Sequence, residues 1–221
     1  MGNQFFDSLY NGYTGEYQLT ASLYRHGLDA LRPPADMGID VVSLNLKQRL
    51  EDPTVAAETF LFQVKTAMTE VGEDETNPGA FQTVCFKLSE RELDLLAHGH
   101  DRALFCYVYN TKADALTDVL ETPFMCFWID GDRLRALREA GAFAKLDGER
   151  KFTLTCQLRK PAHENGHWYA LVVDAQGNKL EHGSISQVGY LGTIGGSLTS
   201  SDDADHYSVG GYLDYARKNQ V

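Results

Sequence analysis

The fold is decided by two apolar stretches, "GIDVVSLNL" at residues 38–46 and "TFLFQVKTA" at residues 59–67. Both contain β-branched residues and the second also contains two phenylalanines, which is typical of β-strands, and the first is entered from an extended loop at Pro33 and Pro34. Parallel neighbours need a crossover connection, and no clear helix pattern separates these stretches. We therefore predict that the two strands pair in antiparallel fashion.

Helices and further strands surround this pair. Thr14 is a candidate N-cap and Gly27 a helix stop, so a helix is expected over residues 14–26. Ser89 and Glu92 have the spacing of a capping box, which predicts a second helix that begins directly after Ser89 and ends at Gly99. Together with expected strands at 83–88, 102–110 and 124–129 and a helix at 132–141, the pattern predicts an α/β fold with a mixed central sheet flanked by helices.

The C-terminal third has a different character. Three strand-like runs at residues 151–158, 167–174 and 179–186 predict an antiparallel β meander, and residues 212–219 predict a short terminal helix. We therefore divide the chain into a core at residues 1–145 and a C-terminal elaboration at residues 146–221.

Composition limits the class of protein. The chain has 221 residues, 43% of them hydrophobic and 23% charged, which favours a globular protein over a disordered one. No stretch approaches the roughly 20 apolar residues of a membrane-spanning helix, and residues 1–13 lack the basic start of a secretory signal. The four cysteines form no C-x-x-C pair and are expected as reduced core residues. We expect a soluble, cytoplasmic protein with no membrane association.

The sharpest chemical feature combines "DMGID", which ends at Asp40, with "FQVKT", which contains Gln63 and Lys65. Alternation along a strand places Gln63 and Lys65 on one face. If Ile39 and Val41 both point into the core, the same alternation places Asp40 on the opposite face from them. Pairing of the two strands can then bring Asp40, Gln63 and Lys65 together.

These residue types suit metal-dependent chemistry. Magnesium binds through oxygen, so Asp40, the Gln63 side-chain carbonyl and the Val64 backbone carbonyl are candidate ligands for Mg²⁺ or Mn²⁺. Lys65 can orient or help to deprotonate an attacking water and offset charge on a phosphate. Glu16, on the upstream helix, is a candidate accessory acid that could hold a second ion.

In this order the residues resemble the PD-(D/E)XK nuclease superfamily, and within it the Mrr-like and Holliday-junction-resolvase-like branches. A first-helix glutamate, a "GID" strand and a "QxK" or "ExK" strand recur there. The resemblance covers about residues 14–140 and not the C-terminal third. It implies a restriction-endonuclease-like fold, metal-dependent hydrolysis of phosphodiester bonds in DNA, and assembly as a homodimer.

One departure from the family pattern supports an alternative function. Gln63 stands where many members of the superfamily have aspartate or glutamate, and a neutral ligand weakens metal affinity. The alternative is a nuclease fold kept as a non-catalytic binding or regulatory module, which works with a protein partner in a defence or mobile-element system.

Candidate nucleic-acid contacts are few, because 20 Lys and Arg against 31 Asp and Glu give a net charge of −11, which repels a polyanion unless basic residues gather locally. Arg135 and Arg138 share one face of a predicted helix and are candidate phosphate contacts, although a solvated helix face is the simpler interpretation. Tyr10, Tyr13 and Tyr17 could stack on bases or pack into the core.

A third interpretation is a zinc hydrolase. The segment "HENGH" at residues 163–167 matches H-E-x-x-H, which binds zinc when it lies on a helix. Pro161 and the Asn165-Gly166 pair instead predict a turn between strands. The zinc interpretation is therefore the less favoured one.

Overall fold

The computed structural model of the chain describes residues 2–34, 37–69, 81–110, 125–145, 150–159, 169–174, 176–178, 180 and 209–219. No helix within these ranges is both long enough and apolar enough to cross a membrane.

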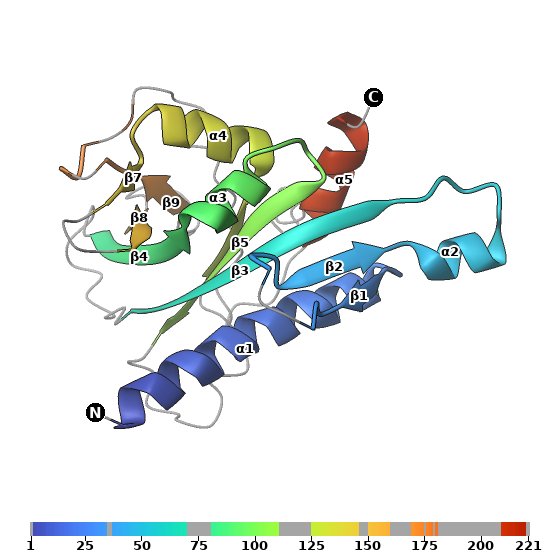
Figure 1. The fold of residues 1–221 in the computed structure, drawn as a ribbon, viewed down its shortest axis with the longest axis horizontal. Coiled ribbons are helices and arrows are strands. Elements are labelled where there is room, and N and C mark those ends of the chain that lie inside the picture. The colour runs from blue at the N-terminus through green and yellow to red at the C-terminus, as the bar shows by residue number, and fades with distance from the viewer. Residues whose placement is uncertain are drawn as a thin grey trace.

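A five-stranded mixed sheet forms the centre of the fold (Figure 1). Its order is β1-β2-β3-β5-β6, and only the pair β3 and β5 is parallel. The predicted antiparallel pairing of the first two long strands is confirmed, with Val41 opposite Phe62. The strands are β1 (Asp29–Leu31), β2 (Val41–Leu44), β3 (Thr59–Thr69), β5 (Arg102–Asn110) and β6 (Met125–Asp130).

Helices cover both faces of this sheet. On one face, Leu19 and Leu23 of α1 (Gly2–Arg25) share a hydrophobic cluster with Phe62 of β3 and with α5 (Val209–Asn219). On the other face, α3 (Glu90–Leu96) and α4 (Gly131–Glu139) contribute to a second cluster with Leu104 of β5 and its neighbours. The chain is therefore an α/β protein with a mixed sheet and flanking helices, as predicted.

A second sheet packs on the side of α3 and α4. Strand β8 (Lys151–Arg159) pairs in antiparallel fashion with β4 (Phe81–Ser89), β7 (Phe143–Ala144) and β9 (Tyr169–Val172). Its apolar side chains join the same hydrophobic cluster as the central sheet, so residues on both sides of position 145 share one core. The third predicted meander strand, at residues 179–186, lies outside the described residues except for Leu180.

Two elements differ from the sequence-based expectation. Helix α1 begins at Gly2, so Thr14 lies inside the helix and does not cap it. Threonine can hydrogen-bond the backbone in helix interiors as well as at caps, which makes an isolated Thr an ambiguous start signal. Helix α2 (Leu46–Glu51) buries none of its residues, and it is shorter than the stretch over which apolar periodicity can be recognised in a sequence.

Two glycines in α1 offer a matched test of how closely this helix packs on β3. A Cβ atom added at Gly15 would lie 2.6 Å from Thr66 Cγ2 and 3.0 Å from Val64 Cγ1, whereas at Gly12 it would meet no described atom within 4 Å. We expect Gly15→Ala to lower the free energy of unfolding by about 1–2 kcal/mol through overpacking. Gly12→Ala should raise it by up to about 1 kcal/mol through helix propensity. Urea denaturation of both variants measures the difference, and equal effects would contradict close packing at Gly15.

Candidate active site

A tight turn before β2 positions Asp40. Gly38 has a φ of +84°, a conformation that side-chain-bearing residues rarely adopt. A Cβ there would also lie 3.1 Å from Leu95 Cδ1 and 3.5 Å from the Cα of Glu92, so the turn rests directly on α3. The Asp40 backbone N–H then donates to the Phe62 carbonyl of β3 at 2.8 Å. The carboxylate is thus held between α3 and the edge of β3.

The condition that Ile39 and Val41 point to the same side of the sheet is not met. Ile39 lies in the hydrophobic cluster with α3 and α4, and Val41 lies in the cluster with α1 and α5. Strand β2 begins only at Val41, so strand alternation does not extend back to Ile39. The turn, and not alternation along the strand, sets the direction of Asp40.

Asp40 lies beside β3 directly before the first residue of β2. Its Oδ2 accepts hydrogen bonds from the backbone N–H of Val64 at 2.8 Å and from Gln63 Nε2 at 2.5 Å. The N–H and C=O groups of a strand residue point the same way, so the Val64 carbonyl is directed toward the edge that Asp40 occupies. The structure therefore brings the three predicted ligand residues to one place.

The Gln63 side chain carries a ligand atom without a partner. Gln63 is 3% exposed, and no described group donates a hydrogen bond to its Oε1. Buried side-chain oxygens in proteins are nearly always hydrogen-bonded, so an unpaired one next to a carboxylate calls for an explanation. A divalent cation, which coordinates amide and carboxylate oxygens, fits this donor set.

Lys65 is fixed by an acidic residue of α3. Its Nζ lies 2.5 Å from Glu92 Oε1, and the other Glu92 oxygen accepts from the Ser89 backbone N–H. Ser89 Oγ in turn accepts from the Glu92 N–H at 3.2 Å, which completes the predicted capping box. Burial opposes ionisation of Glu92, but the charge and hydrogen bond of Lys65, with the Ser89 bonds, outweigh it and lower the pKa of Glu92. A buried ion pair therefore ties β3 to α3.

Glu16 approaches the same centre from α1. Burial first, and then the negative charge of Asp40, raise the pKa of Glu16, while Arg32 and Lys65 act in the opposite direction. Arg32 is the direct partner, with Nη2 2.5 Å from Glu16 Oε2. The electrostatic influence of Asp40 and Lys65 places Glu16 within the field of the candidate site, although Glu16 forms no hydrogen bond or ion pair with either residue.

The buried environment of Asp40 disfavours its ionised form. Burial raises the pKa of Asp40 and outweighs the stabilising Val64 N–H, the Lys65 charge and the Gln63 hydrogen bond. Two carboxyl groups with raised pKa values, Asp40 and Glu16, thus lie in one electrostatic neighbourhood. Carboxyl groups with raised pKa values are typical of functional sites. A bound cation would stabilise the ionised form of both groups and so lower their pKa values.

Sequence reasoning missed Glu92 and Arg32 as members of the site. Glu92 was identified only as a capping residue, and its contact with Lys65 depends on how α3 packs on β3. Arg32 follows β1, a three-residue strand that the sequence did not indicate. The capping-box spacing is the only sequence signal for Glu92, and no pattern in the sequence indicates Arg32.

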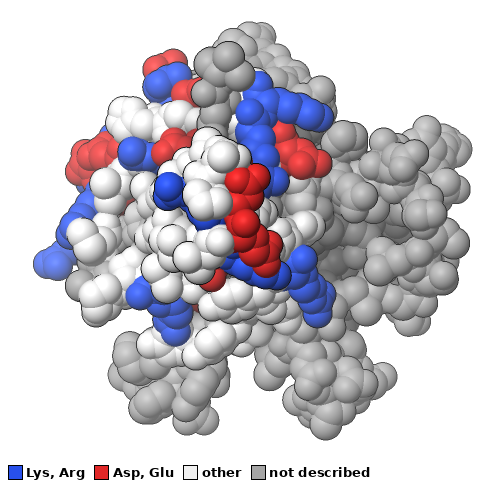
Figure 2. Space-filling model, turned by 90° about the vertical axis from the view of Figure 1, so that its right-hand side faces the viewer, with Lys and Arg blue, Asp and Glu red and all other residues white. Residues whose placement is uncertain are grey.

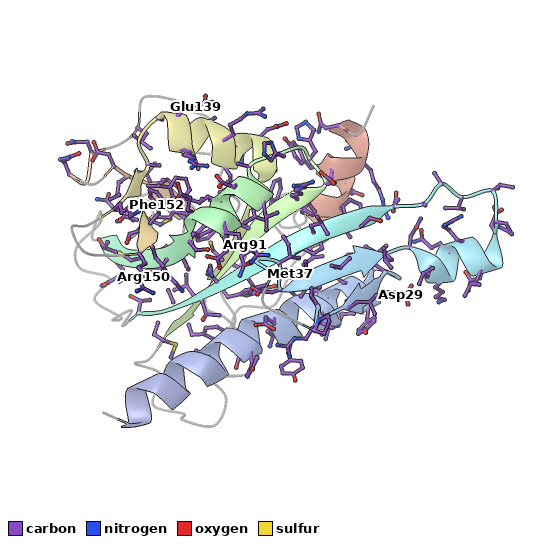
Figure 3. All side chains as sticks on the ribbon, viewed as in Figure 1. Asp29, Met37, Arg91, Glu139, Arg150 and Phe152 are labelled. Carbon is purple, nitrogen blue, oxygen red and sulfur yellow. The ribbon has the colours of Figure 1, made fainter. Side chains whose placement is uncertain are left out.

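The two predicted phosphate contacts are already paired within the protein. Arg135 Nη2 lies 2.7 Å from Asp132 Oδ1, and Arg138 Nη1 lies 2.6 Å from Asp94 Oδ1. Arg91 is different: it is exposed, directly precedes Glu92 and has no ion pair with a described acidic residue (Figure 3). Among these three arginines, Arg91 is therefore the one whose charge is available to a phosphate beside the site.

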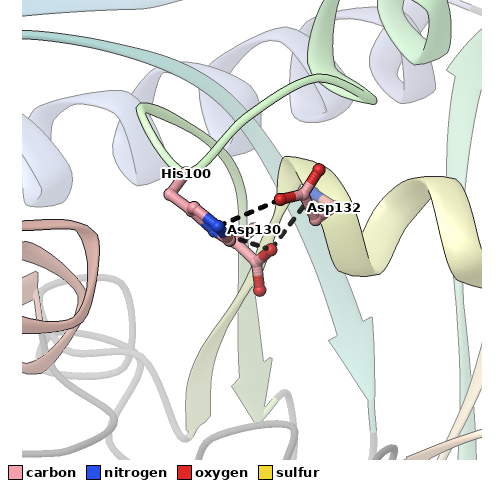
Figure 4. Close-up of side chains that lie close together, drawn as sticks. All are labelled: His100, Asp130 and Asp132. Carbon is pink, nitrogen blue, oxygen red and sulfur yellow. Dashed lines mark hydrogen bonds and ion pairs between the residues drawn. The ribbon is translucent and has the colours of Figure 1, made fainter. Parts of the chain in front are cut away.

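A second group of possible metal ligands lies at the start of α4 (Figure 4). His100 Nε2 lies 3.1 Å from Asp132 Oδ2, and His100 Nδ1 lies 3.8 Å from Asp130 Oδ1. Each carboxylate already has a structural role, since Asp130 caps α4 through two backbone N–H groups and Asp132 pairs with Arg135. Tyr215 of α5 contacts His100 Nδ1 at 3.3 Å. These partners explain the cluster as a connection between α4 and α5.

The zinc-like segment at residues 163–167 lies outside the described residues, so the zinc interpretation stays a prediction. Tyr10 lies in α1, and its side chain is likewise outside the described part.

Basic and acidic side chains are mixed on the face that Figure 2 shows, where the described residues form no broad positive surface. No protein-family model matches this sequence, and a comparison with curated proteins finds no match. The function must therefore be inferred from the site itself.

Proposed function

We propose that this chain is a Mg²⁺- or Mn²⁺-dependent DNA endonuclease of the PD-(D/E)XK type with a restriction-endonuclease-like fold. The observation that carries the proposal is the buried Gln63 Oε1, which lies beside Asp40 and has no hydrogen-bond partner among the described residues. Lys65 lies two residues further along the same strand, which is the arrangement that the sequence resemblance implies.

Each residue of the site has a role in this reaction. Asp40, Gln63 and the Val64 carbonyl would hold the cation, which supplies Lewis-acid stabilisation of charge on the scissile phosphate. Lys65 donates hydrogen bonds to the attacking water or to a phosphate oxygen and offsets the negative charge that develops there. Glu92 holds the Lys65 ammonium in place through their ion pair. Glu16 is the accessory acid.

Replacement of Lys65 tests the proposal. We expect purified protein with Mg²⁺ or Mn²⁺ to cut DNA, and Lys65→Ala to lower the rate by roughly 100-fold or more, because one preorganised electrostatic or proton-transfer group contributes about that much. The rate of conversion of plasmid or oligonucleotide substrate measures the loss. Lys47→Ala is the matched control, because Lys47 is an exposed lysine of α2 whose side chain forms, among the described residues, only a long i,i+4 contact with Glu51. Unchanged cleavage in Lys65→Ala would refute the assignment.

A second candidate is the non-catalytic module, and one observation favours it. Lys65 forms an ion pair with Glu92, and Asp40 Oδ2 accepts hydrogen bonds from Gln63 Nε2 and the Val64 N–H. Most polar groups of the site therefore have protein partners without a cation. Calorimetry that detects no divalent-ion binding, together with a stable protein partner in a pull-down, would favour this function over hydrolysis.

A further inference from the structure

Two tyrosines and an arginine form an exposed aromatic surface beside the site, here called the α1 platform (Tyr13, Tyr17 and Arg32). Tyr13 and Tyr17 are one helical turn apart and share a face of α1. The Arg32 guanidinium lies over both rings, 4.8 Å from the Tyr13 centroid and 5.6 Å from the Tyr17 centroid. Tyr13 is 38% exposed and Tyr17 62% exposed. The platform is thus preorganised, and much of its aromatic surface faces solvent.

The platform is joined to the site by one residue. Arg32 pairs with Glu16 at 2.5 Å, and Glu16 lies in the electrostatic field of Asp40 and Lys65. Glu16 is also the residue directly before Tyr17 in α1. A strand that presents a phosphate to Asp40 and Lys65 would therefore carry a neighbouring nucleotide to the platform.

We propose that the α1 platform binds an unpaired nucleobase by stacking, so that the substrate is single-stranded DNA or a DNA segment with splayed bases. This inference rests on the proposed nuclease function for the position of the phosphate. Every base has a π face that can stack on tyrosine, but in a duplex those faces are covered by neighbouring base pairs. The net charge of −11 opposes binding through charge alone to either form of DNA, so a stacking contribution favours the form whose base faces are open.

Binding without hydrolysis tests this inference separately from catalysis. Fluorescence anisotropy of a labelled oligodeoxynucleotide, single-stranded or annealed to its complement, is measured with the full chain in EDTA at constant ionic strength. We expect tighter binding of the single strand, and Tyr17→Ala should weaken it roughly 5- to 150-fold, the contribution of one base–aromatic stack. Tyr17→Phe keeps the ring and should bind as the unmodified chain does. Tyr24→Ala is the matched control, since Tyr24 is 56% exposed on the same helix and donates to the Ala30 carbonyl, whereas the Arg32 guanidinium lies over Tyr13 and Tyr17.

The outcomes separate the two proposals. Loss of binding in Tyr17→Ala, but not in Tyr17→Phe or Tyr24→Ala, supports the platform even if the protein cuts no DNA. Equal affinity for single strand and duplex, no binding of either, or equal effects of Tyr17→Ala and Tyr24→Ala would overturn it, even if Mg²⁺-dependent cleavage is observed. Quenching of a 2-aminopurine base in the oligonucleotide gives a second readout, because stacking quenches this base and a phosphate contact alone does not.

Discussion

Asp40→Asn is expected to abolish divalent-ion binding and to lower DNA cleavage by roughly 1,000-fold or more. The substitution removes the only carboxylate among the three proposed ligands, Asp40, Gln63 and Val64, and with it most of the charge that holds a hard cation. A metal that polarises the phosphate contributes several kcal/mol to the transition state, and each 1.36 kcal/mol is a factor of ten in rate. Isothermal titration calorimetry with Mn²⁺ and a cleavage assay measure both effects.

The same substitution should leave the stability of the metal-free fold unchanged or increase it. Burial raises the pKa of Asp40, which means that folding disfavours its ionised form. Asparagine removes the charge and keeps an oxygen that can accept from the Val64 N–H. Asp52→Asn is the matched control for metal binding, because Asp52 is an exposed aspartate after α2 whose carboxylate accepts hydrogen bonds from Thr54. Cation binding that survives in Asp40→Asn but is lost in Asp52→Asn would contradict the proposed centre.

The raised pKa of Asp40 also determines in which direction the stability of the fold changes with pH. Between the ordinary value of 3.8 and the raised folded pKa, the folded chain binds more protons than the unfolded chain, so this group adds stability as the pH falls. Glu92 has a lowered pKa and acts oppositely: its contribution is present above the ordinary value of 4.5 and is lost as the pH falls through the folded value. Protons compete with the cation at Asp40. The metal-induced rise in Tm should therefore shrink as the pH falls through the raised pKa, and Asp40→Asn should show no metal-induced rise at any pH.

The part of this site that lies along one strand could be predicted from the sequence. Gln63 and Lys65 are two residues apart in an apolar run, and period-two alternation places them on one face whatever the rest of the chain does. The antiparallel partner could also be predicted, because no crossover helix pattern separates the two strands. Local periodicity and chain connectivity carry both of these inferences.

The direction of Asp40 and the contacts of Glu92 and Arg32 could not be predicted in this way. Asp40 precedes β2 and is oriented by the Gly38 turn against α3, a contact between segments far apart in the sequence. The ion pairs of Glu92 with Lys65 and of Arg32 with Glu16 join residues 27 and 16 positions apart. Such ion pairs depend on how whole helices and strands pack against one another. Periodicity in a single sequence does not indicate this packing.

The largest loss of stability is expected from Gly131→Ala. Gly131 is the first residue of α4, and a Cβ there would meet the Leu96 carbonyl oxygen and lie 2.6 Å from the Gly99 oxygen and 2.9 Å from the His98 oxygen. All three are backbone atoms at the end of α3, so a change of side-chain rotamer cannot make room. Overpacking typically costs 1–3 kcal/mol, and a clash with three backbone atoms belongs at the upper end, so we expect a loss of about 3 kcal/mol.

This loss should extend to the candidate site, because α3 also carries Glu92, the partner of Lys65. Displacement of α3 by the new methyl group would weaken that ion pair, and DNA cleavage by Gly131→Ala should fall even at temperatures where the variant remains folded. Urea denaturation followed by circular dichroism measures the stability, with Gly12→Ala as the control for a glycine-to-alanine change in an open helical position. A loss below about 1 kcal/mol would show that α3 and α4 can separate at little cost, in which case their contact does not fix Glu92.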